Sequence, residues 1–145
     1  MLEESPLAAI AHVIQLAVAP VFLLTGIGGI LAVMTSRLSR IVDRARVLEA
    51  HTSTNAEHQD RVQQELATLS RRAKLISVSI GLCTVTALLV STVIAILFLG
   101  SFLTFDASLA VALLFVAAML AFIAALLSFL REVFLAIASL QIGKH

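Results

Sequence analysis

The sequence from Ser5 to Ser36 reads SPLAAIAHVIQLAVAPVFLLTGIGGILAVMTS, with no Asp, Glu, Lys or Arg, and continues from Arg37 to Arg46 as RLSRIVDRAR. A helix needs about 20 apolar residues to cross a hydrocarbon core of about 30 Å, because a bilayer offers no water to an exposed backbone. The stretch is therefore predicted to span a membrane. The basic run that follows it marks the membrane boundary.

Two further charge-free stretches follow, from Leu75 to Phe105 and from Ala107 to Leu130, and only Asp106 separates them. The 145 residues are 60% hydrophobic and 13% charged, which excludes an ordinary soluble domain. We expect transmembrane helices at about 8–36, 75–103 and 107–130. A secretory signal peptide is a poor alternative for the first, because no basic residue precedes it and the apolar run is too long.

The Lys and Arg residues predict the orientation. The segment from Arg37 to Lys74 holds eight of the ten, whereas none occurs before Arg37 or in the turn at Asp106. Short loops rich in Lys and Arg stay in the cytoplasm. We therefore expect an outside amino terminus, a cytoplasmic segment 37–74 and a cytoplasmic tail 131–145.

Apolar residues recur in segment 37–74 at spacings of three and four, which predicts a helical hairpin with a narrow apolar seam. We call these residues the hairpin seam: Leu38, Ile41, Ala45, Leu48, Val62, Leu66, Leu69, Ala73 and Ile76. Thr54 and Glu57 form a capping-box pattern that restarts a helix. The expected fold is all-α, one membrane domain of three transmembrane helices, the first two extended into the hairpin.

One side of the first helix carries a stripe that is polar at the outer end, small in the middle and basic at the inner end. We call these residues the first-helix stripe: Gln15, Ala19, Phe22, Gly26, Gly29, Val33, Arg37, Arg40 and Arg44. In a ring of several copies, this face would line a pore with a cationic inner mouth. Alternatively, the glycines pack against neighbouring helices and the arginines bind anionic lipid headgroups or carboxylates.

The other charged residues of the hairpin suit a solvated surface. Five of them are candidates for lipid-headgroup contacts or ion pairs: Asp43, Arg46, Arg71, Arg72 and Lys74. The second span has its own row of small residues, whose ordinary role is close helix packing. The expected partners are the lipid bilayer, with anionic lipids at the cytoplasmic face, further copies of the chain, and a cytoplasmic protein.

No motif in the chain announces a reaction. The sequence has no metalloprotease, serine-hydrolase or phosphate-loop pattern, and His51 and His58 match no metal-ligand spacing. Basic residues are interleaved with acids and lack an aromatic platform, which argues against nucleic-acid binding. We expect no enzyme activity, no catalytic residue, no metal and no cofactor.

Several stretches resemble a known family. They are the segment from Pro20 to Gly29, the run from Arg37 to Arg46, the run from Arg71 to Ile76, and Phe129-Leu-Arg131-Glu132. Together they resemble the bacterial membrane proteins grouped as domain of unknown function twenty-seven twenty-one. The resemblance implies a bacterial inner-membrane protein with three helices, and it brings no activity and no site residues.

Two functional hypotheses lead, ahead of an intramembrane enzyme, which a hydrated cavity with a bound metal would favour. The first is a homo-oligomeric channel or pore for ions or small solutes, lined by the first helix. The second is a membrane scaffold whose hairpin docks another protein. A continuous axial opening in a ring of copies would favour the first hypothesis, and a closed bundle with a bare hairpin seam would favour the second.

Overall fold

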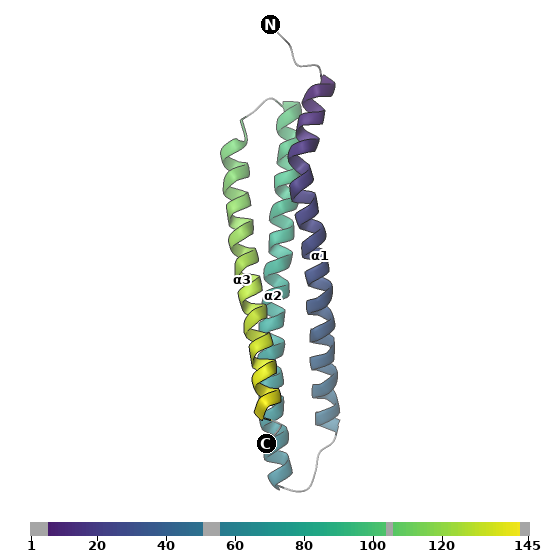
Figure 1. Ribbon diagram of the computed structural model, residues 1–145, viewed down its shortest axis with the longest axis vertical. Helices are drawn as coiled ribbons and strands as arrows, with labels where there is room; N and C mark the ends of the chain where they lie inside the picture. Colours follow the sequence, from purple (N-terminus) through teal and green to yellow (C-terminus); the bar gives the residue numbers. More distant parts are fainter. Residues whose placement is uncertain (1–5, 51–55, 104–105, 143–145) are drawn as a thin grey trace. The chain divides into compact units, whose positions relative to one another are not determined.

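The computed structural model describes residues 6–50, 56–103 and 106–142. They form three α-helices, α1 (Pro6–Ala50), α2 (Ala56–Leu103) and α3 (Ser108–Ile142) (Figure 1). No strand occurs among the described residues, so the predicted all-α class is confirmed.

Each helix is long and apolar enough to cross a membrane, in agreement with the predicted number of three membrane helices. At about 1.5 Å per residue, the 45 residues of α1 and the 48 of α2 are about 70 Å long, more than twice the thickness of a hydrocarbon core. Both helices run without interruption between their charge-free and charged parts. α1 continues through Pro20, and α2 contains no proline.

Helix α3 ends later in the chain than the sequence analysis expects. The helix continues to Ile142, through most of the segment 131–145 that was assigned to a tail. No Pro or Gly occurs between Leu130 and Ile142, so nothing in the sequence stops the helix there. The predicted capping box lies partly outside the described residues, because Thr54 is not among them.

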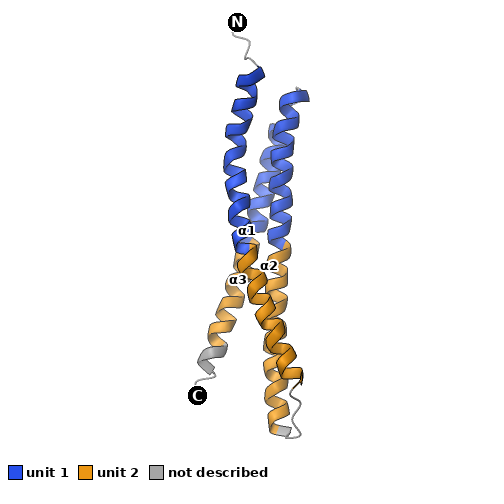
Figure 2. Ribbon diagram, turned by 90° about the vertical axis from the view of Figure 1, so that its right-hand side faces the viewer, with its two compact units in different colours: residues 1–30, 82–123 blue, residues 31–81, 124–145 orange. Residues whose placement is uncertain are grey.

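Backbone contacts divide the chain into two compact units, coloured separately in Figure 2. Unit 1 comprises residues 1–30 and 82–123, and unit 2 comprises residues 31–81 and 124–145. Each helix contributes one part to each unit.

The core of unit 1 is built from small and β-branched side chains. Its buried residues are Val13, Ala17, Pro20, Ile27, Cys83, Thr86, Val90, Val93 and Ala118. Lipid tails are as apolar as leucine, so helices in a bilayer associate through close packing, which small residues permit. The side chains of Thr86 and Thr92 donate hydrogen bonds to carbonyls four residues earlier in α2.

The core of unit 2 contains larger side chains and one charged group. Its buried residues are Met34, Ile41, Leu69, Ile76, Ser79, Ala125 and Glu132. Three of them belong to the hairpin seam, and the other six seam residues are all half-buried. The seam is therefore covered within the chain rather than bare.

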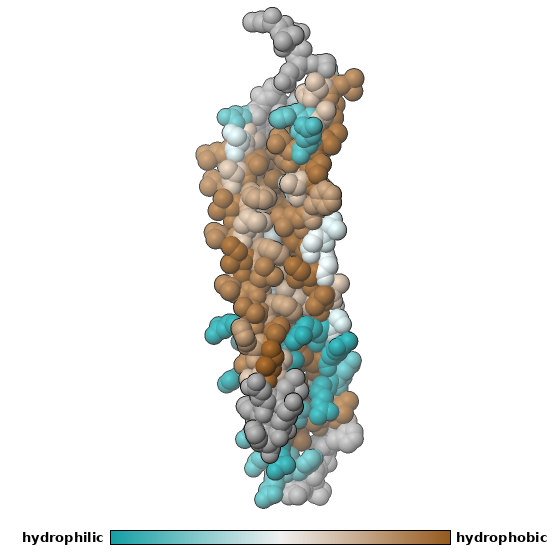
Figure 3. Space-filling view, in the orientation of Figure 1, coloured by the Kyte–Doolittle hydropathy of each residue, from teal (hydrophilic) through white to brown (hydrophobic). Residues whose placement is uncertain are grey.

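Hydropathy also separates the two units. On the face shown in Figure 3, most hydrophilic side chains lie over unit 2, whereas hydrophobic ones cover most of unit 1. In the described part of unit 1, Asp106 is the one Asp, Glu, Lys or Arg residue.

Candidate functional site

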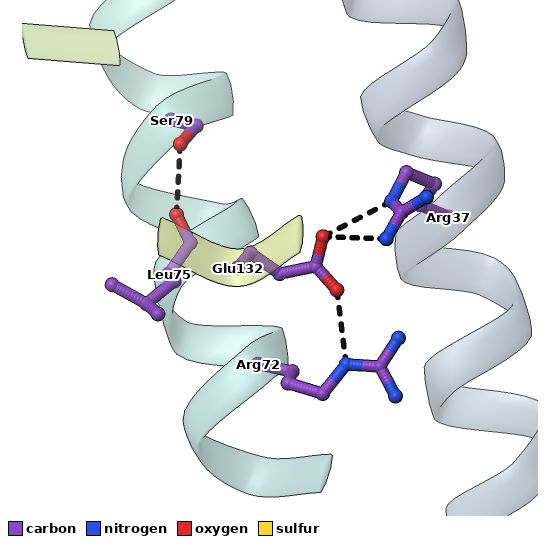
Figure 4. Close-up of polar contacts among 5 residues, drawn as sticks. All are labelled: Arg37, Arg72, Leu75, Ser79 and Glu132. Carbon is purple, nitrogen blue, oxygen red and sulfur yellow. Dashed lines mark hydrogen bonds and ion pairs between the residues drawn. The ribbon is translucent and has the colours of Figure 1, made fainter. Parts of the chain in front are cut away.

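A buried carboxylate joins all three helices inside unit 2. Glu132 of α3 has no exposed surface and lies between Arg37 of α1 and Arg72 of α2 (Figure 4). Arg37 Nε and Nη2 lie 3.0 and 2.8 Å from Glu132 Oε2, and Arg72 Nε lies 2.9 Å from Glu132 Oε1. We call Arg37, Arg72 and Glu132 the arginine–glutamate triad.

The triad forms where each charge-free stretch meets charged sequence. Arg37 directly follows the first stretch, Arg72 precedes the second by three residues, and Glu132 follows the third by two. Three helices that cross the same bilayer must reach its surface at similar depth, so these residues come together.

Burial decides the strength of these contacts. The side chains of Arg37 and Arg72 are 32% and 20% exposed, against 0% for Glu132. A carboxylate out of water is tolerated when charge-assisted hydrogen bonds satisfy both of its oxygens, as the two guanidinium groups do here. Removing one partner from such a cluster is costly, because it leaves an uncompensated buried charge.

An aromatic ring contacts the triad, and a buried hydroxyl of α2 bonds to its own helix. The Arg37 guanidinium carbon lies 5.5 Å from the centre of the Phe129 ring, a cation–π distance. Ser79 is buried, and its hydroxyl donates to the Leu75 carbonyl at 3.0 Å (Figure 4). No buried side-chain nitrogen or oxygen in the described part of the chain lacks a hydrogen-bond partner.

A second ion pair in unit 2 is more open. Arg44 Nη2 lies 3.2 Å from Glu65 Oε1, and the two side chains are 56% and 44% exposed. Exposed pairs of this kind contribute about 0–1 kcal/mol, because water and salt screen the charges. The pair joins α1 to α2, and removing either of its partners should cost much less than removing one from the triad.

Four arginines share one cavity beside the triad. The cavity has a volume of about 240 Å³ and is lined by Arg37, Arg40, Ile41, Arg44, Leu69 and Arg72. We call it the four-arginine cavity. The sequence analysis placed three of these arginines on the first-helix stripe, to line a pore or to bind lipid headgroups or carboxylates, and Arg72 among the lipid or ion-pair candidates. The fold brings both sets together.

The first-helix stripe lies mostly on the surface of the chain. Arg37 is half-buried, whereas every other member is exposed. A Cβ atom added at Gly26 or Gly29 would have nothing within 4 Å, so no other helix of the described chain packs closely against these glycines.

The predicted lipid or ion-pair residues fall into three groups. Arg72 belongs to the triad. Arg71 and Lys74 line a groove of about 730 Å³ together with Arg131 and five apolar residues. Asp43 and Arg46 are exposed and form no ion pair with the residues that the structure describes.

The chemistry available at these sites is recognition of charge. Among the described residues, no three His, Cys, Asp or Glu side chains lie close enough together to hold a metal ion. His12 is exposed, Cys83 is buried, and His51 lies outside the described residues. The triad and its cavity can hold an anion through the guanidinium N–H groups that Glu132 leaves unused.

The sequence analysis missed Glu132 as a site residue. It noted the residue only within the run Phe129-Leu-Arg131-Glu132, as part of the family resemblance. A signal was available, because Glu132 is the one acid in the last 39 residues and directly follows the third charge-free stretch. What the sequence could not give was its burial between two arginines from other helices.

One comparison with known proteins gives a match. A family model described as "Protein of unknown function (DUF2721)" matches residues 17–142, which include the whole triad and the four-arginine cavity. No curated protein and no solved structure matches the chain. The matched residues cover most of the sequence, and the chain belongs to this family of proteins of unknown function.

Proposed function

We propose that this membrane protein assembles with further copies of itself and forms a pore for ions or small solutes lined by α1. The observation that carries the proposal is the exposure of the first-helix stripe. Gly26 and Gly29 have open space beside them in the single chain, so no other helix of the described chain occupies this face. In a ring of copies this face would line the axis.

The ion pairs at the basic end of the first-helix stripe decide which arginine would act in the pore. Arg37 is held by Glu132 and Arg44 by Glu65, so each has a carboxylate partner. Arg40 is exposed and has no ion pair with the described residues. Arg40 is then the residue that sets the field at the inner mouth and favours anion entry, since fixed positive charge concentrates anions in a confined space.

The scaffold hypothesis receives less support. It required a bare apolar seam on the hairpin for a partner protein, and the seam residues are buried or half-buried within the chain. A partner would therefore have to bind another surface.

The test is ion flux into liposomes, measured beside the size of the assembly. Gly29→Leu should block flux and leave the oligomer intact, because Gly29 would lie at the narrow part of the pore. Gly28→Leu is the matched control: Gly28 is also exposed with open space, but it lies off the first-helix stripe. Its flux should stay near the wild-type value.

Other outcomes would change the proposal. If Gly29→Leu dissociates the oligomer, Gly29 serves helix packing rather than conduction. If an intact oligomer gives no flux under any gradient, voltage or pH, the pore is refuted and the scaffold becomes the better hypothesis.

We further propose a bacterial inner-membrane location, which the family resemblance implies. We also propose an outside amino terminus and a cytoplasmic carboxyl terminus, which the one-sided Lys and Arg residues support. Single cysteines in a background without Cys83 test the orientation. Cysteines at positions 3 and 106 should react with an impermeant reagent from outside, and those at positions 55 and 144 only from inside. Labelling of position 55 from outside would reverse the topology.

A further inference from the structure

The four-arginine cavity carries more positive charge than its carboxylates neutralise. Arg37, Arg40, Arg44 and Arg72 supply four positive charges, and Glu65 and Glu132 return two negative ones, which leaves a net charge of +2. Both carboxylates are already engaged by arginines of the same cavity. An anion with one or two negative charges, from outside the described residues, would balance the remaining positive charge.

The arginines also offer suitable donors. The contacts with Glu132 use Nε and Nη2 of Arg37 and Nε of Arg72, so Arg37 Nη1 and both Nη atoms of Arg72 make none of these contacts. A guanidinium presents five N–H donors in a planar fork that matches the oxygens of a phosphate group. Glu132 thus holds the guanidinium groups of Arg37 and Arg72 in position before any ligand arrives. This lowers the entropic cost of binding.

The position of the cavity suits a phosphate group. Arg37 and Arg40 lie within four residues after the charge-free part of α1, and Arg72 lies three residues before that of α2. This is the depth at which phospholipid headgroups lie and at which a soluble phosphate can arrive from water. The aliphatic side chains of Ile41 and Leu69 complete the lining and exclude water from one side.

We propose that the four-arginine cavity binds a phosphate group, presented either by an anionic lipid headgroup or by a soluble phosphate. The site joins α1 to α2, so its occupation stabilises the folded chain. The proposal does not depend on a pore, and its test requires neither flux nor an oligomer.

The experiment measures the thermal unfolding of the full chain in a neutral detergent. A ligand that binds the folded state and not the unfolded one raises Tm, and the stabilisation grows as RT ln(1 + L/Kd), where L is its free concentration. The probes are phosphatidylglycerol in the micelles and inorganic phosphate in the buffer, compared with phosphatidylcholine and with sodium chloride of equal ionic strength. A shift with phosphatidylglycerol alone assigns a lipid headgroup, and a shift with inorganic phosphate assigns a soluble ligand.

Arg40→Gln is the test variant, because Arg40 is exposed and its loss leaves no buried carboxylate unpaired. Removing one charge-assisted contact should weaken the apparent affinity about tenfold. Arg46→Gln is the matched control: Arg46 is an exposed arginine of the same helix, and it does not line the cavity. Its affinity should change less than about twofold, since exposed charges at a distance are screened.

Two results would overturn the proposal. One is the absence of a shift with either phosphate probe beyond the two comparison conditions. The other is an equal loss of affinity in Arg40→Gln and Arg46→Gln, which would show attraction to the basic segment as a whole rather than a site.

Discussion

Unit 1 and unit 2 are built from parts of the same three helices and are held together by different forces. The described part of unit 1 has one charged residue, and small side chains such as Ala17 and Ala118 lie in its core. Unit 2 contains the arginine–glutamate triad, the Arg44–Glu65 pair and the hairpin seam. Unit 1 depends on close packing, and unit 2 has ion pairs in addition to packing.

The difference arises because unit 1 is suited to hydrocarbon, whereas much of unit 2 is suited to water. In hydrocarbon, burying an apolar side chain gains nothing, so shape complementarity between small residues must hold the helices together. Near water, apolar burial becomes favourable again and charged groups can be solvated on one side while they pair on the other. The sequence changes from one composition to the other within each helix.

Breaking the triad should give the largest effect. Glu132→Gln keeps the shape of the side chain but leaves Arg37 and Arg72 facing each other without a carboxylate. We expect the free energy of unfolding to fall by about 3 kcal/mol, measured by reversible unfolding in mixed micelles. Glu65→Gln is the control and should cost less than about 1 kcal/mol, because its pair is exposed. Equal costs would mean that burial does not distinguish the two pairs.

The hairpin seam should give the next largest effect. Ile41→Asn places an amide among apolar side chains, and we expect it to cost about 2 kcal/mol in the same unfolding measurement. Gln63→Ala, an exposed change on the facing helix, should be nearly silent. If both variants unfold alike, unit 2 depends on its charges alone.

Disrupting the close packing of unit 1 should give a smaller effect. Ala118 has no exposed surface, so Ala118→Leu forces the helices apart, and we expect a cost of about 1–2 kcal/mol. Ala117 is exposed on the same helix, and Ala117→Leu should change stability little, as seen in parallel unfolding curves. Tolerance of leucine at both positions would contradict close packing as the force that holds unit 1.

The smallest effect concerns the one charged residue of unit 1. Asp106 Oδ1 accepts hydrogen bonds from the hydroxyl and the backbone N–H of Ser108, which lower its pKa below the ordinary value of 3.8. Because the folded pKa is the lower one, the stabilisation is fully present above pH 3.8 and is lost as the pH falls through the folded pKa.

The measurement is Tm between about pH 6 and pH 3. The difference in Tm between the wild type and Asp106→Asn should shrink slightly towards the acid end, since Asn carries no charge to lose. A difference that grows at low pH would show that the pKa of Asp106 is raised rather than lowered.

Much of the fold could be predicted from the sequence. Charge-free stretches longer than 20 residues specify spanning helices, because a bilayer leaves the backbone no other partner. Apolar spacings of three and four also placed the seam residues on one side of each helix, and the structure buries or half-buries all nine. Such signals depend on residues close together along the chain.

The site could be predicted only in part. Arg37, Arg40, Arg44 and Arg72 were selected as charged residues of interest, yet they were divided between two roles because they lie on two helices. Glu132 was not selected at all. Its role depends on neighbours 60 and 95 residues away, and no local pattern records such a pairing.

The sequence by itself determined the three helices and the places where apolar gives way to charged composition, because these depend on local hydrogen bonding and on transfer from water to hydrocarbon. Only the tertiary structure decided which charges are paired. It buries Glu132 between Arg37 and Arg72 and leaves Arg40 exposed beside them. The energy of a charge depends on its burial and on the distance to its partners, and packing of the three helices sets both.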